Sequence, residues 1–390
     1  DIREKEPFTD NPMNEFASSG TYYFKSGELA KQYITDNIEN NLNVNGEFYI
    51  SMPYRPMIEA GLNVAVYELQ HFMQWGTPDD LEEYNYWSNI FRSLNELDKP
   101  GTDPQPGTML LPMAGAGARF QAVGYTDAKP LIPVSGTPMS TQAMSTWPKH
   151  GKAVVITREE VLGKNADFTP SAPGTNSEMM VIDQMTEGQA STCSLAQDRV
   201  DPNQPMTIAP CDSGALYDQS DFSKQLSSDA DVLIWAVRGH PRAAQHPEQY
   251  GWIAETNGIV TKISTKVPLE DPKTDPIVIG TFTFKKASDF FRSADHMYER
   301  DGRINGEFYV DECINDAIEM GLTCKVFEID HSLPWGTPDE LDTFHYWQSC
   351  FHKWASHPYR LENDPFVAPE NVEKLEDTYP PIHPTRPPVR

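Results

Sequence analysis

A glycine loop followed by two cations is the part of this sequence best suited to chemistry. Gly115 and Gly117 stand in MAGAGARF, where the lack of side chains lets backbone N–H groups approach an anion. Arg119 follows closely, and Lys129 lies further on in AKPLIPVSGTPM. Two cations beside such a loop can neutralise a triphosphate, whereas glycines that only serve a turn and a surface lysine are the simpler alternative. The spacing fits neither GxxxxGK[ST] nor GxGxxG, because residue 120 is Phe.

The surrounding pattern alternates apolar runs with helical periodicity. Strands are expected at residues 108–113, 152–157, 206–211, 231–237, 251–255, 259–264, 277–284 and 324–329, and helices near 140–147, 188–197, 287–299, 307–320 and 338–354. This alternation predicts a three-layer α/β fold with a mostly parallel central sheet. Ligands of such sheets bind at the carboxyl ends of the strands, where the glycine loop is expected.

An internal repeat divides the chain. Residues 20–87 align without a gap to residues 280–347, and 25 of the 68 aligned residues are identical. NGEFY and WGTPD occur in both segments, and further upstream EKEPF pairs with TKVPL if one residue is inserted. A period this long indicates a duplicated domain and not a solenoid.

The repeat predicts the domain boundaries. Residues 1–97 form the C-terminal part of a first copy, 98–107 a Pro/Gly-rich linker, 108–355 a complete domain, and 356–390 a proline-rich tail that is extended and either exposed to solvent or draped over a domain. Because the first copy lacks a glycine loop and the chain begins without Met, we expect either a piece of a longer tandem protein or a degenerate copy. We also expect residues 1–97 to pack tightly, since Phe48, Tyr49, Phe72 and Trp75 would otherwise be exposed.

Composition limits the partners. With 57 acidic and 31 basic side chains the formal charge is −26, which argues against a nucleic acid polymer or an anionic membrane as partner. Hydrophobic residues make up 38% of the chain, enough for a core, and no run is long enough to span a bilayer. Five scattered cysteines without a CxxC pair favour reduced thiols and a cytoplasmic protein.

Taken together, the motifs PMAGAGARF, KPLIPV, TEGQA, an Asp-ended strand, YG and WGTP resemble the sugar-phosphate nucleotidyltransferases, especially capsule and lipopolysaccharide members beginning MAGAGxRF. The resemblance covers about residues 108–355 as a whole domain and 1–94 as the back half of another. It implies a Rossmann-like nucleotidyltransferase fold. The implied reaction is attack by a sugar 1-phosphate oxygen on the α-phosphate of an NTP, with pyrophosphate leaving.

The resemblance also implies roles for particular residues on the nucleotide side. Gly115, Ala116 and Gly117 would wrap the phosphates, Arg119 would stabilise the departing pyrophosphate, and Lys129 would contact the phosphates near the reacting centre. Glu187, Gly188 and Gln189 would recognise the base, although Thr186 and Gln189 also fit a capping box. Asp212 would bind the catalytic Mg²⁺, the one expected cofactor, although a strand-end Asp can also be an ordinary turn residue.

On the acceptor side, the resemblance assigns Tyr250 and Gly251 to the sugar pocket, Lys266 to the sugar phosphate and Glu307 to sugar hydroxyls. Glu307 also fits a helix N-terminus, where a carboxylate meets the helix dipole. Two departures are notable. The glutamate of the EK(P) motif is replaced in TKVP, and Pro334 stands where many relatives place a second metal-binding Asp or Asn.

The hypothesis is therefore a Mg²⁺-dependent nucleotidyltransferase that uses an NTP and a phosphorylated small molecule for surface polysaccharide synthesis. Neither the base nor the acceptor is specified, and a homo-oligomer is left open. The alternative is a non-catalytic nucleotide- or sugar-sensing protein, which Pro334 and TKVP favour. A scaffold built around the proline-rich tail has only composition in its favour.

Overall fold

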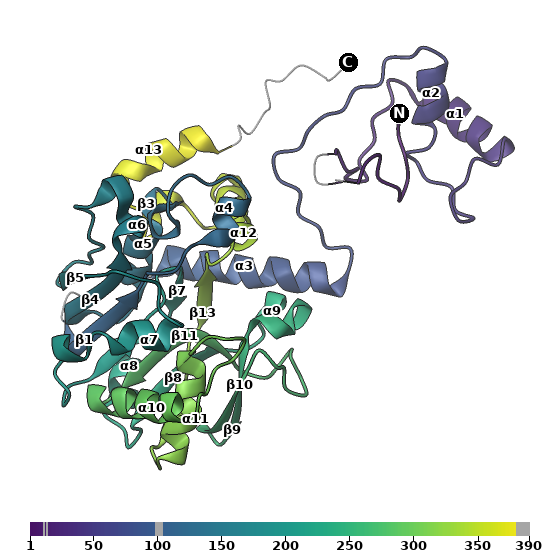
Figure 1. Ribbon diagram of the computed structural model, residues 1–390. Helices are drawn as coiled ribbons and strands as arrows, with labels where there is room; N and C mark the ends of the chain where they lie inside the picture. The colour runs from purple at the N-terminus through teal and green to yellow at the C-terminus, as the bar shows by residue number, and fades with distance from the viewer. Residues whose placement is uncertain (11, 13–14, 98–103, 380–390) are drawn as a thin grey trace. The chain divides into compact units, whose positions relative to one another are not determined.

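The computed structural model describes residues 1–10, 12, 15–97 and 104–379. The chain forms two compact units, residues 1–73 and residues 74–378, which are described separately (Figure 1). This division differs from the expected boundaries. The end of the first repeat, from Gln74 onward, belongs to the same unit as the complete domain.

A nine-stranded sheet forms the centre of the second unit, in the order β5-β4-β1-β6-β11-β8-β12-β10-β9. The strands are β1 (Gln105–Pro112), β4 (His150–Arg158), β5 (Asn176–Ile182), β6 (Met206–Ile208), β8 (Val232–Val237), β9 (Gly251–Thr256), β10 (Ile259–Thr265), β11 (Ile277–Phe284) and β12 (Cys324–Glu328). Every strand expected from the apolar runs is present, while β5 was not expected. Its residues are mostly half-buried, because only β4 pairs with it.

The expectation of a mostly parallel sheet is wrong, because the sheet is mixed. Strands β5, β4, β1 and β6 pair in parallel, as do β8 and β12. Strand β11 lies antiparallel between β6 and β8, and β9 and β10 form an antiparallel hairpin next to β12. Apolar runs identify strands but not their direction, since direction depends on which distant strand becomes the neighbour.

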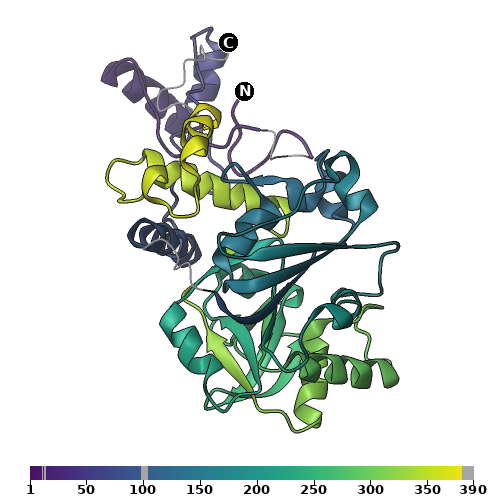
Figure 2. The same ribbon diagram turned by 90° about the vertical axis from the view of Figure 1, so that its left-hand side faces the viewer.

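Helices cover both faces of this sheet (Figures 1 and 2). One face packs against α7 (Gln189–Ser194), α10 (Ala287–Glu299) and α11 (Val310–Glu319) through a cluster that includes Ile234 and Phe290. On the other face Trp235 contacts Trp147, which follows α5 (Met139–Thr146), and Phe222 of α8 (Gln219–Leu226). Neighbouring residues Ile234 and Trp235 point to opposite faces, as strand geometry requires.

Short elements complete the second unit: helices α4 (Ala118–Ala122), α6 (Glu159–Leu162) and α9 (Pro241–Gln245), the strand pair β2 (Pro133–Val134) and β3 (Thr137–Pro138), and the strand pair β7 (Ser213–Leu216) and β13 (His331–Pro334). The residues that connect these elements carry most of the expected site.

Helices α3 (Pro78–Glu96) and α12 (Pro338–Lys353) occupy corresponding positions in the two repeats and pack against each other within the second unit. Phe91 of α3 lies 5.5 Å from Phe344 and 5.6 Å from Phe351 of α12, measured between ring centroids. Each helix begins at a Thr whose hydroxyl accepts a hydrogen bond from the third residue of the helix. The last helix of the first repeat is thus part of the complete domain's core.

The first unit holds α1 (Gly27–Glu39) and α2 (Tyr54–Glu59). Its local backbone matches the second repeat: α1 corresponds to α10 at the same offset, and Lys5 and Lys266 share a left-handed conformation (φ 58° and 62°). The β-bridge Val44–Glu47 likewise corresponds to Ile304–Glu307. A duplicated segment would show these correspondences, and the duplication itself stays a prediction.

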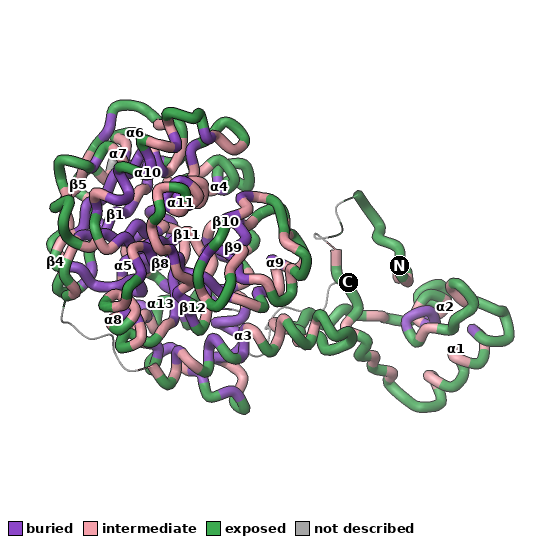
Figure 3. The backbone as a smooth tube through the Cα atoms, turned by 90° about the horizontal axis from the view of Figure 1, so that it is seen from below, coloured by how far each residue is buried: buried purple, intermediate pink, exposed green. Residues whose placement is uncertain are grey.

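Large side chains of the first unit are exposed within the unit itself, and the expected packing of residues 1–97 against the complete domain or a second chain stays a prediction. Phe48 and Phe72 are 47% and 46% exposed, and Trp75, just inside the second unit, is 53% exposed. Figure 3 shows the chain around α1 and α2 coloured mostly as exposed. In the second repeat, by contrast, the corresponding Phe308 and Trp335 are buried. The reason is that residues 64–68 and 71–74, which correspond to strands β12 and β13, form no strand here.

Of the two courses expected for the tail, residues 356–378 follow the one draped over a domain, although part of the segment is helical and not extended. Tyr359 and Leu361 are fully buried, and α13 (Pro369–Thr378) buries Asn371 and Leu375. Residues 380–390 of the predicted tail and residues 98–103 of the predicted linker lie outside the described residues, while residues 105–107 of that linker belong to β1. Among the described residues, no helix combines the length and the apolar character needed to cross a membrane.

Candidate functional site

The glycine loop lies where the sequence predicts it, between the end of β1 and the start of α4. Gly117 has a left-handed backbone (φ 65°), and a Cβ there would lie 3.0 Å from the Cβ of Lys129. Glycine is therefore required both for the conformation and for the close approach of Lys129. Gly115, Ala116 and Arg119 are exposed, whereas Phe120 is buried and anchors α4. The exposed backbone of this loop can be reached by a ligand.

Lys129 and Asp212 form an ion pair next to this loop. Lys129 Nζ also donates to the carbonyl oxygen of Gly336 at 2.8 Å, in the WGTP motif. Burial alone would lower the pKa of Lys129, but Asp212 and other nearby anionic groups outweigh it and raise that pKa. Lys129 is therefore a permanent cation, held between Asp212, which directly precedes β7, and Gly336 in the loop between β13 and α12. Three motifs that are far apart in the sequence meet at this ammonium group.

The TEGQA turn is fixed by a backbone pairing with residue 308. Phe308 N donates to Glu187 O (2.7 Å), and Ala190 N donates to Phe308 O (3.0 Å). A Cβ on Gly188 would lie 2.5 Å from Phe308 O, so this position also requires glycine. The capping-box interpretation of Thr186 is wrong, because α7 begins after Gly188 and the Thr186 hydroxyl donates to Gly188 O.

The side chains of this turn are only partly available. The Glu187 carboxylate pairs with Arg303 at 2.9 Å, a partner that no sequence pattern predicts. Arg303 in turn stacks over the Phe308 ring, with Cζ 4.2 Å from the ring centroid. A role for Glu187 and Gln189 in base recognition stays a prediction.

The acceptor-side residues are close enough to interact electrostatically. The pKa of Lys266 is lowered overall. Burial is the main cause and the Arg119 guanidinium adds to it, whereas the carboxylates Asp311 and Glu307 act in the opposite direction. Arg119, Lys266 and Glu307 therefore lie in one neighbourhood, so the structure brings together a loop residue and two residues from the second half of the domain. The Lys266 amide donates to Tyr250 O at 3.1 Å, which joins YG to TKVP.

Sequence reasoning missed two carboxylates. Asp311 is half-buried, and desolvation raises the pKa of its carboxyl to about 6; a Cβ on Gly251 would lie 2.5 Å from its Oδ2. Glu340 lies next to Asp212: a Cβ on Gly336 would be 3.3 Å from Glu340 Oε2 and 3.4 Å from Asp212 Oδ2. Glu340 belongs to the repeated WGTPDEL motif, which was a usable signal, whereas nothing in the sequence singled out Asp311.

Pro334 lies beside Asp212 but offers no ligand atom. It is the β13 residue that pairs with Ser213 of β7, and the following amide, Trp335 N, donates to Asp212 O at 3.0 Å. Glu340 instead supplies a second carboxylate at this place. Two carboxylates near Gly336 are the kind of donor that suits a hard divalent cation, although Asp212 Oδ2 is already ion-paired with Lys129, so a Mg²⁺ ion would have to use the other carboxylate oxygens or displace this ammonium group.

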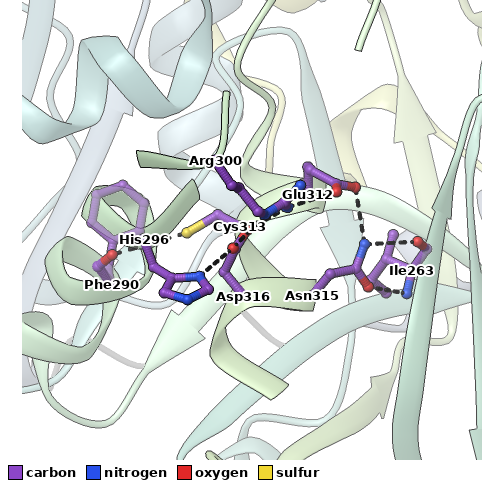
Figure 4. A network of polar contacts seen from close by, with 8 residues as sticks. All are labelled: Ile263, Phe290, His296, Arg300, Glu312, Cys313, Asn315 and Asp316. Carbon is purple, nitrogen blue, oxygen red and sulfur yellow. Dashed lines mark hydrogen bonds and ion pairs between the residues drawn. The ribbon is translucent and has the colours of Figure 1, made fainter. Parts of the chain in front are cut away.

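A polar network attaches α11 to its neighbours and so positions the acceptor side (Figure 4). The buried Asp316 carboxylate accepts hydrogen bonds from Arg300 Nε and Nη2 and lies in contact with His296 Nδ1, all at 2.7 Å. Asn315 is paired with both the N–H and the C=O of Ile263 in β10. Because Arg300 already bonds to both oxygens of the Asp316 carboxylate, we interpret this network as stabilising the fold and not as binding a ligand.

The sequence matches no model of a protein family, and no curated protein matches it. The fold, however, is similar to solved structures. A nucleoside-diphosphate-sugar pyrophosphorylase from Vibrio cholerae RC9 is 18% identical, with 60% of this chain and 98% of that chain covered and a TM-score of 0.50. The inositol-1-phosphate CTP transferase from T. maritima is 12% identical (64% and 97% covered, TM-score 0.47). The UTP-bound UGPase from Acinetobacter baumannii is 13% identical (64% and 95%, TM-score 0.48).

These structural neighbours are nucleotide-sugar pyrophosphorylases and related nucleotidyltransferases. At 18% identity the likeness to the Vibrio cholerae protein establishes a fold of that type for this chain and nothing more specific. What the chain does must be argued from its own residues.

Proposed function

We propose that this protein is a nucleotidyltransferase that transfers an NMP from an NTP to a sugar 1-phosphate, or a similar phosphorylated metabolite, and releases pyrophosphate. The observation that carries the proposal is the meeting of Lys129 and Asp212 beside the glycine loop, with Arg119 and Lys266 nearby. Cations beside an exposed backbone loop are what phosphoryl chemistry needs, since it depends on positioning and charge neutralisation. The proposed role in surface polysaccharide synthesis is supported by the sequence resemblance alone.

In the proposed mechanism, a phosphate oxygen of the acceptor attacks the α-phosphorus of the NTP. The new P–O bond forms as the α–β bridging bond breaks, and pyrophosphate leaves with the electron pair. Lys266 binds the acceptor phosphate, Lys129 neutralises charge near the α-phosphate, and Arg119 neutralises charge on the leaving group. Asp212, with Glu340 beside it, would hold Mg²⁺, which screens the phosphate charges when it is bound. The acceptor needs no general base, because its phosphate is already anionic.

A pyrophosphate-release assay tests this proposal with the four common NTPs and a panel of phosphorylated acceptors, with and without Mg²⁺. We expect release only when NTP, acceptor and Mg²⁺ are all present. Asp212→Asn and Arg119→Ala should each lower the rate by about 10²–10³-fold. Asp198→Asn and Arg292→Ala replace exposed residues of the second unit that have no role in the proposed mechanism, and they serve as matched controls. If the protein binds nucleotide but releases no pyrophosphate with any acceptor on the panel, the proposed enzymatic activity is refuted.

The second candidate, a nucleotide or sugar sensor, is favoured by the absence of a ligand atom at Pro334. In a sensor, the Lys129–Asp212 pair would persist and nucleotide would bind without metal. Calorimetry with nucleotide in the presence and absence of Mg²⁺ separates the two, because an affinity that does not depend on Mg²⁺, together with no turnover, is the expected result for a sensor.

A further inference from the structure

Helices α3 and α12 carry the same aromatic pattern on the faces where they meet. Each has aromatic rings at three positions that are spaced by three and four residues: Tyr84, Trp87 and Phe91 on α3, and Phe344, Trp347 and Phe351 on α12. Residues with this spacing lie on one face of a helix. The two sets occupy equivalent positions, because the alignment of residues 20–87 with residues 280–347 continues through both helices at the same offset. We call these six residues the aromatic seam.

The contacts across the aromatic seam are reciprocal. The ring of Tyr84 on α3 lies 6.0 Å from the ring of Phe351 on α12. Exchanging the two repeats turns this contact into the one between Phe91 and Phe344, whose rings are 5.5 Å apart. Phe91 and Phe351 are equivalent to each other, and their rings lie 5.6 Å apart. Contact between equivalent residues is expected next to a two-fold axis.

The two tryptophans of the seam follow the same rule. The ring of Trp347 lies 6.1 Å from that of Tyr84, and the ring of Trp87 lies 6.3 Å from that of Phe344. Five of the six side chains are buried and Tyr84 is half-buried. An interface in which residue i contacts j while the equivalent of j contacts the equivalent of i is isologous, which is the arrangement found in two-fold dimers. Two segments of one chain therefore form a two-fold interface here.

The residues of α12 suit the place that α3 occupies. A second α12 in that place would present the same tryptophan and the same phenylalanine, and would replace the Tyr84 ring by that of Phe344, which lacks only the hydroxyl. The Tyr86 hydroxyl of α3 donates to Ser332 O at 3.2 Å, and α12 has a tyrosine, Tyr346, at the equivalent position. The aromatic face of α12 is therefore complementary to itself.

Contacts outside the seam favour α3 over a separate partner. The ring of Tyr359 lies 4.7 Å from that of Phe91, and His357 Nε2 lies 3.2 Å from Ser88 Oγ. These contacts break the symmetry, since the residue equivalent to His357 is Leu97, which has no side-chain hydrogen-bonding group. Helix α3 also belongs to the same chain, and a tethered segment acts at an effective concentration of about millimolar. We therefore expect α3 to exclude a second chain as long as it stays in place.

We propose that the aromatic face of α12 is a self-complementary docking surface and that its partner is α12 of a second copy of this chain. In the intact chain, α3 occupies this surface as the internal equivalent of the second α12. The surface becomes available to another copy when α3 is displaced. This inference is independent of the proposed function, because it follows from the reciprocal ring contacts.

Displacing α3 in the full chain tests the proposal. Phe91→Asp places a charge at a fully buried position of the seam, so α3 can stay in place only by burying that charge. Hydrogen exchange of residues 78–96 reports whether α3 has left. Leu81→Asp is the matched control, because it adds the same charge to α3 at a position that is 45% exposed.

Two labelled peptides serve as probes in fluorescence anisotropy. One comprises residues 336–354 and contains α12, and the other comprises residues 76–97 and contains α3. We expect both peptides to bind Phe91→Asp with dissociation constants within about tenfold of each other, and neither to bind the wild type or Leu81→Asp. Replacing Phe344 and Phe351 by Ala in the first peptide should weaken its binding by about tenfold or more, because buried aromatic rings carry much of the energy of an interface.

Sedimentation of the full chain tests the second copy directly. Phe91→Asp should form a dimer as its concentration rises, and an excess of the peptide of residues 336–354 should return it to a monomer. The wild type and Leu81→Asp should show no dimer that this peptide dissociates. If Phe91→Asp does not fold, Tyr84→Ala/Phe91→Ala removes the same contacts without adding a charge and takes its place.

The opposite outcomes overturn the proposal. If the displaced protein binds the α3 peptide and not the α12 peptide, the surface is specific for α3 and is not self-complementary. If it binds neither peptide although α3 has left, the face of α12 is not a docking surface. If it stays a monomer at every concentration, or forms a dimer that the α12 peptide does not dissociate, a second copy does not dock through α12.

Discussion

The contact between Gly117 and Lys129 allows the loop to be tested with a single methyl group. In Gly117→Ala the new Cβ would lie 3.0 Å from Lys129 Cβ, whereas unstrained carbon atoms stay about 3.5 Å apart or more. Lys129 must therefore retreat by about 0.5 Å from the position in which it pairs with Asp212. A left-handed alanine costs a further 1–2 kcal/mol or so of stability.

Gly258→Ala is the matched control. Gly258 also has a left-handed backbone (φ 78°), but no atom lies within 4 Å of its Cβ position, and it belongs to the turn between β9 and β10. Both variants should lose about 1–2 kcal/mol in urea unfolding. Only Gly117→Ala should also lose function. Since a misplacement of about 1 Å can cost about 100-fold, we expect a fall of about tenfold in kcat/KM for pyrophosphate release.

The assay is steady-state pyrophosphate release, together with calorimetry of the NTP to separate binding from chemistry. Equal loss of activity in both variants would mean that general destabilisation, and not the displacement of Lys129, explains the effect. Full activity in Gly117→Ala would refute the claim that pyrophosphate release depends on the exact position of Lys129.

Three further predictions concern other parts of the second unit. Gly251→Ala should weaken acceptor binding at least tenfold or so by displacing the Asp311 carboxylate, 2.5 Å from the new Cβ, and calorimetry with the acceptor measures this. Burial raises the pKa of Asp364 to about 6, above its unfolded value, so its contribution to stability is complete below about pH 4 and is lost as the pH rises through about 6. The stability difference between wild type and Asp364→Asn, from urea unfolding, should therefore shift in favour of the variant between pH 4.5 and pH 7, and a pH-independent difference would refute this. Phe91→Ala, at a fully buried position between α3 and α12, should cost about 3–5 kcal/mol in urea unfolding, against less than about 1 kcal/mol for the half-exposed Phe72→Ala.

Much of the secondary structure follows from local pattern. Helix α10 begins and ends at the expected residues, and α12 differs from its expected range by one residue. The burial within the tail was the feature least predictable from the sequence: Tyr359 and Leu361 are buried, although their neighbourhood is rich in polar residues. Burial of these two side chains depends on the partner surface of α3 and α12, which no local pattern encodes.

The site was partly predictable for a similar reason. The glycine loop and Lys129 carry their chemistry in residue type and spacing, so they could be identified as candidates for phosphate binding. Glu340 and Asp311 become members of the site only in the folded chain. Glu340 lies close to Gly336, across the turn that precedes its helix, and Asp311 lies close to Gly251, which is far away in the sequence. The sequence likewise did not indicate that the Glu187 carboxylate forms an ion pair with Arg303.

The sequence by itself determined which segments are strands, helices and phosphate-suited loops, and it revealed the repeat, because these depend on side-chain type and spacing along the chain. The tertiary structure alone decided the direction of β11, the pairing of Lys129 with Asp212, and the incorporation of α3 into the complete domain. Each of these depends on which distant segments become neighbours. That choice is made by the burial of whole faces and by the pairing of buried polar groups, and both are properties of the folded chain.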